Sequence, residues 1–197
     1  MIETYKYDKA MMSTAYVWAE ESYCKRNQVG AILSFDGRVV SVGYNGTISG
    51  SSNCCEETEA FKSEGELEFY DKSLIEVCAT CKGTGILLEF SGTKLNTVLT
   101  GRKTCEDCNG FGKVKNKDIS KDTVVHAEAN AILFAAKNGI PTKNCTLYIT
   151  LSPCIECAKM IIQSGIKEVI YDAEYRINDG VKFLQKHGIS TRKLNLV

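Results

Sequence analysis

The sequence predicts an α/β fold in which a mixed sheet carries helices on its faces and a small insertion interrupts the chain. β-prone runs alternate with helical runs in the second half, a β-hairpin signal precedes them, and 197 residues suit one domain. Alternation implies parallel pairing in the later part of the sheet, whereas a hairpin is antiparallel. We therefore expect one domain over residues 1–197, with an inserted segment at about residues 74–116.

The first half begins with a helix and a hairpin. Residues 8–24 place apolar side chains at helical spacing. β-prone runs at residues 29–35 and 38–44 flank Asp36-Gly37, which is a two-residue turn signal. These residues therefore predict a helix followed by two antiparallel strands.

The second half alternates helices and strands. Alanine-rich residues favour the first of these helices, Asn138-Gly139 closes it, and Pro153 suits the first position of the next. In chain order we expect a helix at residues 126–139, a strand at 145–150, a helix at 153–165, a strand at 168–171, a helix at 179–186 and a strand at 189–196.

Composition excludes several classes of function. The formal charge is zero, with 24 Lys and Arg against 24 Asp and Glu, which argues against a groove for a polyanion. No stretch approaches the roughly 20 apolar residues of a membrane span, and residues 1–6 lack the apolar core of a signal peptide. We therefore expect a cytoplasmic protein whose ten cysteines are reduced thiols and metal ligands rather than disulfides.

The most informative pattern is His126-Ala127-Glu128 followed by Pro153-Cys154-Ile155-Glu156-Cys157. One imidazole and two thiolates suit a zinc ion and leave a fourth position for water, whose pKa then falls to about 7. The positive ends of two helices should lower both thiol pKa values, so Cys154 and Cys157 are expected to bind as thiolates. Glu128 is placed to transfer protons, which is worth roughly 10² to 10⁴ in rate.

Each half of this pattern also has a plainer interpretation. A Cys-x-x-Cys pair can form a structural zinc knuckle or a redox dithiol, and Glu128 could be a surface residue. A closed structural zinc usually takes four protein ligands, however, and this cluster offers three. The chain has two histidines, and the other, His187, is expected on the surface.

The inserted segment contains two copies of Cys-x-x-Cys-x-Gly-x-Gly, at residues 78–85 and 105–112. They resemble the cysteine-rich zinc module of DnaJ-type chaperones. Glycines allow the backbone to turn around sulfur, and a metal stabilises comparable small zinc units by about 10 to 16 kcal/mol. We expect a structural Zn²⁺, with a redox dithiol as the alternative; its ligands would be Cys78, Cys81, Cys105 and Cys108.

Several stretches outside residues 56–121 carry a family resemblance. They are Gln28-Val29-Gly30-Ala31-Ile32, Gly43-Tyr44-Asn45-Gly46, Asn53-Cys54-Cys55, and residues 126–132, 151–159 and 164–167. The chain resembles the zinc-dependent cytidine deaminase superfamily, and within it the deoxycytidylate (dCMP) deaminases of phages and cells. The resemblance implies a three-layer fold with a mixed five-stranded sheet and helices on both faces. It also implies hydrolysis of dCMP to dUMP and ammonia, which supplies dUMP for thymidylate synthesis in a cell or a phage-infected host.

The resemblance assigns roles residue by residue. His126, Cys154 and Cys157 become ligands of the catalytic zinc, and Glu128 moves protons from the attacking water to the ring nitrogen and the departing amine. Four positions are expected to contact the nucleotide: Asn45, Ala127, Ser152 and Tyr175. A turn role for Asn45, whose amide could hold the sugar, and a packed or surface role for Tyr175 are the alternatives.

The resemblance also implies regulation and assembly. Effectors of the dCTP and dTTP type, with Mg²⁺, are expected near Tyr44 to Gly50, with contacts from Gly43, Tyr44 and Gly46. A homo-oligomer, either a dimer or a hexamer, is implied as well. Lys137 stands where the family has an arginine, and it lacks the planar fork that suits phosphate, so allosteric control is in doubt.

A second metal of some phage relatives is a further point of departure. It uses cysteines that match Cys24 and Cys54, together with ligands shortly before the catalytic histidine. Val124 and Val125 offer no ligand there, so the sequence leaves this metal open.

Two other classes of function compete with a nucleotide deaminase. A deaminase acting on RNA or single-stranded DNA would need a basic, aromatic-rich channel, which the neutral charge disfavours. A nucleotide sensor or chaperone-like binding module would use the frame without catalysis. The intact His126, Glu128, Cys154 and Cys157 argue against this second class.

Overall fold

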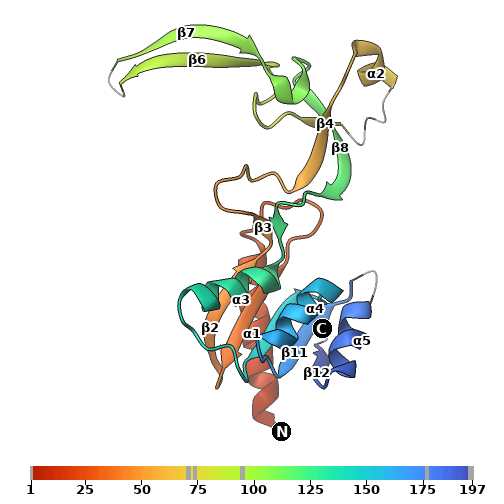
Figure 1. Cartoon of the computed structure of the whole chain (residues 1–197). Coiled ribbons are helices and arrows are strands. Elements are labelled where there is room, and N and C mark those ends of the chain that lie inside the picture. Colours follow the sequence, from red (N-terminus) through yellow and green to blue (C-terminus); the bar gives the residue numbers. More distant parts are fainter. Residues whose placement is uncertain (1, 70–71, 73–74, 94–95, 176–177, 195–197) are drawn as a thin grey trace. The chain divides into compact units, whose positions relative to one another are not determined.

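The computed structural model describes residues 2–69, 72, 75–93, 96–175 and 178–194. The chain divides into two compact units, of which the first comprises Met1–Cys55 with Thr123–Val197 and the second Glu56–Asp122 (Figure 1). The second unit is wider than the segment expected at residues 74–116, because a strand that begins at Glu56 pairs with one that ends at Ser120.

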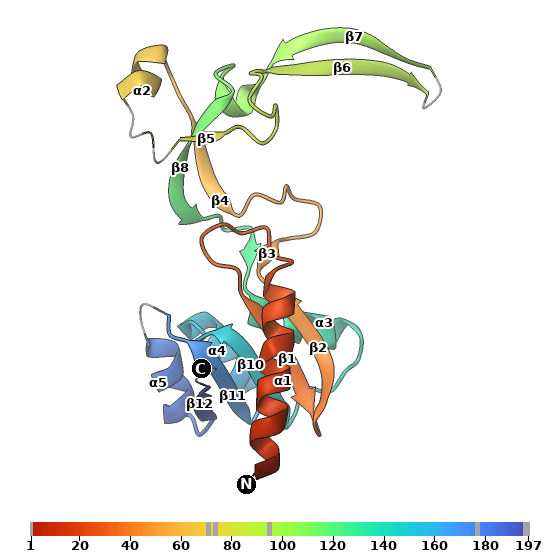
Figure 2. The same cartoon turned by 180° about the vertical axis from the view of Figure 1, so that it is seen from behind.

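The first unit is built on a five-stranded mixed sheet with the strand order β12-β11-β10-β1-β2 (Figure 2). β1 pairs antiparallel with β2 and β10, whereas β11 pairs parallel with β10 and β12. The expected α/β fold with a hairpin and a parallel second half is therefore confirmed. The strands are β1 (Gly30–Phe35), β2 (Arg38–Tyr44), β10 (Thr146–Leu151), β11 (Glu168–Ala173) and β12 (Ser190–Lys193), and a two-stranded ribbon joins β3 (Gly46–Thr47) to β9 (Val124–Val125).

The turn between β1 and β2 has the geometry that its residues predict. Asp36 and Gly37 both have positive φ, at 49° and 70°. A two-residue hairpin loop of this kind matches the right-handed twist of the flanking strands. The turn thus sets the pairs Phe35–Arg38 and Ser34–Val39, and an irregularity between Leu33 and Ser34 shifts the register beyond them.

Helices cover both faces of this sheet (Figure 1, Figure 2). α1 packs on one face through Met11, Met12 and Ala15, and the other helices of the first unit pack on the opposite face. Among the described residues, no helix combines the length and apolar character needed to cross a bilayer. The helices are α1 (Ile2–Ala19), α3 (Ala127–Lys137), α4 (Ile155–Gln163) and α5 (Asp179–Lys186).

The bounds of α1, α3 and α4 differ from the sequence prediction. α3 spans Ala127–Lys137 rather than residues 126–139. α1 spans Ile2–Ala19 rather than residues 8–24, because Ser22 turns away to bond the backbone oxygen of Asn45 at 2.7 Å. α4 begins at Ile155 rather than at Pro153, because Cys154 is extended, with φ −75° and ψ 171°. α5 has the bounds that were predicted.

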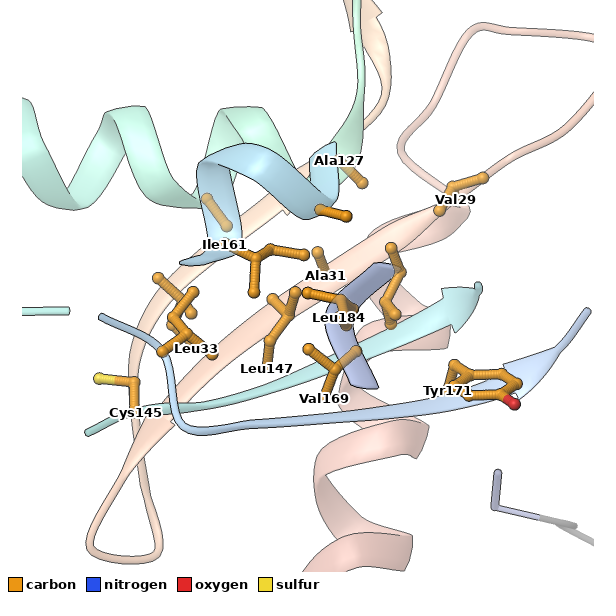
Figure 3. Packing of buried hydrophobic residues seen from close by; sticks show 14 of the residues in the cluster. Val29, Ala31, Leu33, Ala127, Cys145, Leu147, Ile161, Val169, Tyr171 and Leu184 are labelled. Atoms are coloured by element: carbon orange, nitrogen blue, oxygen red, sulfur yellow. The ribbon is translucent and has the colours of Figure 1, made fainter. Parts of the chain in front are cut away.

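The main core lies between the sheet and the face that carries α3, α4 and α5. In Figure 3 the side chains of Leu33, Leu147 and Val169 rise from neighbouring strands toward Ile161 of α4 and Leu184 of α5. All five are fully buried. This packing fixes the position of α4, whose start carries Cys154 and Cys157.

The second unit consists of short β elements. β8 lies between β4 and β5 and is antiparallel to both, and β6 and β7 form a separate hairpin. Its elements are β4 (Glu56–Ala60), α2 (Glu64–Phe69), β5 (Ile75–Val77), β6 (Ile86–Thr93), β7 (Asn96–Thr104), the 3₁₀ turn η2 (Glu106–Cys108) and β8 (Lys113–Ser120).

Candidate active site

Three metal-binding side chains from two helix starts meet in the first unit. His126 is the N-cap of α3, Cys154 is the N-cap of α4, and Cys157 lies in the first turn of α4. Their ligand atoms lie within 4.8 Å of one another, with His126 Nδ1 3.5 Å from Cys154 Sγ and 3.4 Å from Cys157 Sγ. Bond lengths of tetrahedral zinc place a nitrogen and a sulfur ligand about 3.5 Å apart. The cluster therefore fits a zinc ion.

The two thiols respond differently to this environment. A hydrogen bond from Cys157 lowers the pKa of Cys154 to about 3. The same hydrogen bond, together with burial, raises the pKa of Cys157 well above its ordinary value. The two sulfurs thus share one proton, and the fall that the helix ends were expected to cause in both thiol pKa values is found at Cys154. A cation that bonds both sulfurs has to displace that proton.

Glu128 is a buried carboxyl beside the cluster. It lies in the first turn of α3, its exposed fraction is 4%, and its side chain interacts with Cys157. Burial raises its pKa to about 7, although nearby His126 opposes this. A carboxyl with a pKa near neutrality can both accept and return a proton, which suits general acid and base catalysis.

The start of α5 touches the backbone that carries Cys154. A Cβ atom at Gly180 would lie 2.0 Å from the carbonyl oxygen of Pro153 and 2.9 Å from the carbonyl carbon of Cys154. These neighbours are backbone atoms, so they cannot rotate away as a side chain would. The lack of a side chain at Gly180 therefore lets α5 pack directly against the backbone that positions Cys154.

Gly180→Ala is expected to disturb the metal cluster without removing a ligand. Displacing the Pro153–Cys154 backbone should weaken zinc retention against a chelator and lower the free energy of unfolding by about 1–3 kcal/mol. Gly65→Ala is the matched control, because a Cβ there meets nothing within 4 Å. Chelator titration and urea unfolding measure both effects; a Gly180→Ala protein as metal-retentive as Gly65→Ala would contradict this support role.

Asn45 is largely occupied by backbone contacts. Its Oδ1 accepts a hydrogen bond from Val29 N at 2.8 Å, and its Nδ2 donates to Asn27 O at 2.8 Å. Its side chain is nearly buried, at 9% exposure. Asn45 thus holds the loop at residues 27–29, and one donor and one acceptor position of the amide remain for a ligand.

The other expected substrate residues lie around the same cluster, in different settings. Ser152 is buried, and its Oγ accepts a hydrogen bond from Tyr175 N at 2.8 Å. Ser152 therefore positions the segment that carries Tyr175, which is 37% exposed. The side chain of Ala127 is fully buried in the core (Figure 3), and a nucleotide contact of this residue stays a prediction.

The residues expected to contact an effector pack against other parts of the first unit. A Cβ at Gly43 would lie 2.4 Å from the backbone oxygen of Ala127, so β2 and α3 touch there. Tyr44 stacks on Trp18 with ring centroids 6.2 Å apart, and its carbonyl accepts a hydrogen bond from Asn130. Gly46 lies in the β3–β9 ribbon. Gly43 and Tyr44 thus brace the start of α3.

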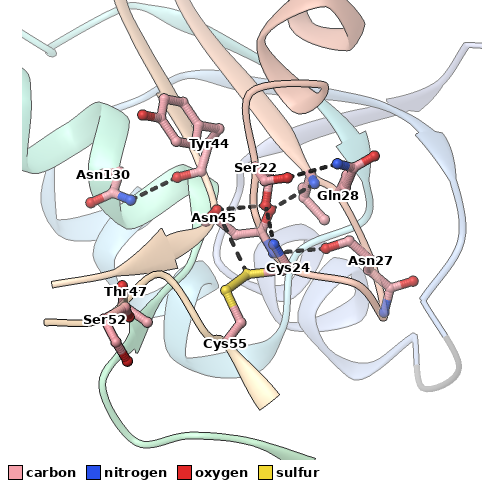
Figure 4. The surroundings of a disulfide bond; sticks show 11 residues. Ser22, Cys24, Asn27, Gln28, Tyr44, Asn45, Thr47, Ser52, Cys55 and Asn130 are labelled. Carbon is pink, nitrogen blue, oxygen red and sulfur yellow. Dashed lines mark hydrogen bonds between the residues drawn. A yellow bond between two sulfur atoms is a disulfide. The ribbon is translucent and has the colours of Figure 1, made fainter. Parts of the chain in front are cut away.

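Cys24 and Cys55 form a disulfide, with their Cα atoms 5.0 Å apart (Figure 4). The expectation that all ten cysteines are thiols or metal ligands was therefore wrong. The prediction rested on the redox compartment, which says nothing about which loops meet. Because its sulfur is bonded to Cys55, Cys24 is not available in this structure as a ligand of a second metal with Cys54. Cys24 Sγ lies 3.8 Å from Asn45 O, so the disulfide adjoins the Asn45 loop.

Two supporting residues were not identified from the sequence. Asn130 fixes Tyr44 through its side-chain amide, and Gly180 allows α5 to approach Cys154. A glycine in the first turn of a helix, where it weakens helix formation, was the available signal for Gly180. His187 is exposed, as the sequence predicted.

The comparisons with known proteins agree with this geometry. A model of the cytidine and deoxycytidylate deaminase zinc-binding region matches residues 5–173. The deoxycytidylate deaminase of Enterobacteria phage T4 is 34% identical over 179 residues, which cover 85% of this chain and 78% of that protein. The human deoxycytidylate deaminase is 31% identical over 161 residues, which cover 81% of this chain and 61% of that protein.

Solved structures give the same picture. The dCMP deaminase of cyanophage S-TIM5, crystallised with dCMP and dUMP, has a TM-score of 0.61 and 30% identity, and the match covers 94% of this chain and 95% of that one. A deaminase/reductase from Thermotoga maritima, at a TM-score of 0.54 and 19% identity, shares the fold. The three-layer fold expected from the sequence is thus confirmed.

Proposed function

The chain belongs to the cytidine and deoxycytidylate deaminase family, and we propose that it hydrolyses dCMP to dUMP and ammonia. One observation carries this proposal: His126, Cys154 and Cys157 converge with metal-ligand spacing beside the buried carboxyl of Glu128. The relatives with which the chain shares about a third of its residues are deoxycytidylate deaminases.

His126, Cys154 and Cys157 would hold the zinc ion in this site. When bound there, zinc supplies a Lewis acid that makes water nucleophilic at neutral pH. The reaction forms a C–O bond at C4 of the cytosine and breaks the C–N bond to its amino group. Glu128 accepts a proton from the attacking water, protonates the ring nitrogen, and later delivers a proton to the departing ammonia.

Substrate contacts follow from the positions of the neighbouring side chains. We assign a sugar hydroxyl to the remaining donor and acceptor of Asn45. Tyr175, which is partly exposed and held through Ser152, is assigned to the nucleotide as an aromatic contact. Assembly into a dimer or hexamer, and control by dCTP or dTTP with Mg²⁺, stay predictions of the family resemblance.

A substrate panel tests the proposal. Purified protein is incubated separately with dCMP, cytidine, dCTP and a short cytosine-containing oligonucleotide while ammonia is followed. We expect release from dCMP at a kcat/KM at least tenfold above that for the other three. Preference for the oligonucleotide would instead indicate a nucleic-acid deaminase, and release from none of them would refute the enzymatic assignment.

A further inference from the structure

Four cysteines gather at the centre of the second unit, outside the chemistry described above. All are buried, and their sulfur atoms lie within 4.8 Å of one another. They come from the two sequence repeats, which are separated by the β6–β7 hairpin. The four are Cys78, Cys81, Cys105 and Cys108.

The sulfur separations fit a tetrahedral metal rather than disulfides. Cys78 Sγ lies 3.9 Å from Cys105 Sγ, and Cys81 Sγ lies 3.7 Å from Cys108 Sγ. A zinc–sulfur bond of about 2.3 Å gives a tetrahedron whose edges are about 3.8 Å long, whereas a disulfide needs about 2.05 Å. The cluster is thus already spaced for a cation bonded to every sulfur.

The two repeats interlock through reciprocal backbone bonds. Cys78 N donates to Gly112 O, and Cys105 N donates to Gly85 O, both at 2.9 Å. Gly85 N and Gly112 N each donate to the second sulfur of their own repeat at 3.3 Å. The repeats are therefore related by an approximate two-fold arrangement, in which each completes the other's turn.

The last glycine of each repeat is required at this interlock. Gly85 and Gly112 have φ of 72° and 69°. A Cβ on Gly85 would lie 2.0 Å from Gly110 O, and one on Gly112 would lie 2.1 Å from Gly83 O. A side chain at either position would strain the backbone and push the two repeats apart. These glycines therefore set the spacing of the sulfur atoms, although they are not metal ligands themselves.

From this geometry we propose that the second unit contains a closed four-thiolate site for a thiophilic divalent cation, Zn²⁺, whose role is structural. Amide N–H groups aimed at Cys81 and Cys108 favour the thiolate form that such a cation needs. Four protein ligands complete a tetrahedron, so the site offers no position for water or substrate. It is therefore distinct in kind from the three-ligand site of the first unit.

The second unit has a small apolar core, which explains why it would need a structural metal. The cluster of buried residues around the sulfurs contains the four cysteines and Val114, with Leu87 packed against it. Phe61 is also buried, and Lys115 lies over its ring. Such a small apolar core favours a metal as the link between the two repeats.

Elemental analysis of the full-length protein tests the proposal without relying on activity. We expect two zinc ions per chain in the wild type, one in Cys78→Ser/Cys105→Ser, and one in Cys157→Ala, because the two sites are separate. If Cys157→Ala protein contains no zinc while Cys78, Cys81, Cys105 and Cys108 are reduced, the four-thiolate site does not exist. This outcome is distinguishable from failure of the deaminase proposal, which the substrate panel measures.

Glycine variants test the interlock while retaining every ligand. Gly85→Ala and Gly112→Ala are made in a Cys157→Ala background and reconstituted with Co²⁺, whose thiolate complexes absorb strongly. Each should lose Co²⁺ at a chelator concentration at least tenfold lower than the parent Cys157→Ala protein requires. Gly65→Ala, where a Cβ meets open space, should match its parent. If Gly85→Ala and Gly112→Ala also match the parent, the proposed interlock is overturned.

Discussion

Glu128→Gln is expected to lower kcat for dCMP deamination by about 10²- to 10⁴-fold and to leave the zinc content unchanged. Gln keeps the size of the side chain in its buried position, but it cannot accept and return a proton. The loss should appear in kcat more than in KM, because the proton is transferred during the reaction rather than on binding. Steady-state kinetics and elemental analysis of the same preparation measure both quantities.

Glu156→Gln is the matched control for this experiment. Glu156 also lies in the first turn of a helix at the site, between the two cysteines, but its side chain is exposed and pairs with Lys159. The same substitution there should change kcat by less than about threefold, since an exposed ion pair contributes little. Near-normal turnover by Glu128→Gln would rule out the proton-transfer role.

Cys157→Ala is expected to remove the catalytic zinc and to reduce deamination below detection. Cys157 is 1% exposed and supplies one of three ligands, so its loss leaves Cys154 and His126 to hold the ion. Without the Lewis acidity that zinc would supply, Glu128 would lack an activated water from which to accept a proton. Zinc analysis and ammonia release are the measurements.

Cys145→Ala separates loss of the metal from loss of a buried sulfur. Cys145 is equally buried, but it lies in the main core, with its sulfur near Pro141 O. This variant should retain both zinc and activity, at a modest cost in stability. An active, zinc-replete Cys157→Ala protein would show that Cys157 is not a ligand.

Local chemistry made the hairpin, α5 and the metal pattern predictable. Asp36-Gly37 adopts the positive φ values that its turn type requires, because that choice depends on two neighbouring residues. His126, Cys154 and Cys157 could be grouped as candidate metal ligands because the pattern predicts that they lie at the starts of two helices. The turn depends on two neighbouring residues, whereas the meeting of His126 with the cysteines depends on how α3 and α4 pack.

Contacts between residues far apart in the sequence were not predictable in the same way. The disulfide joins Cys24 to Cys55, and no local signal distinguishes Cys55 from Cys54 as the partner. Asp8 is buried on α1, where Tyr148 and Arg192 both donate hydrogen bonds to its carboxylate. Such contacts follow from tertiary packing, which periodicity does not encode.

The β3–β9 ribbon has a consequence for how this chain can change. Thr47 lies opposite Val124, so the segment that follows β2 and the segment that leads into α3 run side by side. No strand of the order β12-β11-β10-β1-β2 is drawn from the intervening sequence. We therefore expect residues 56–122, which form the second unit, to tolerate changes of length or exchange without displacing His126, Glu128, Cys154 and Cys157.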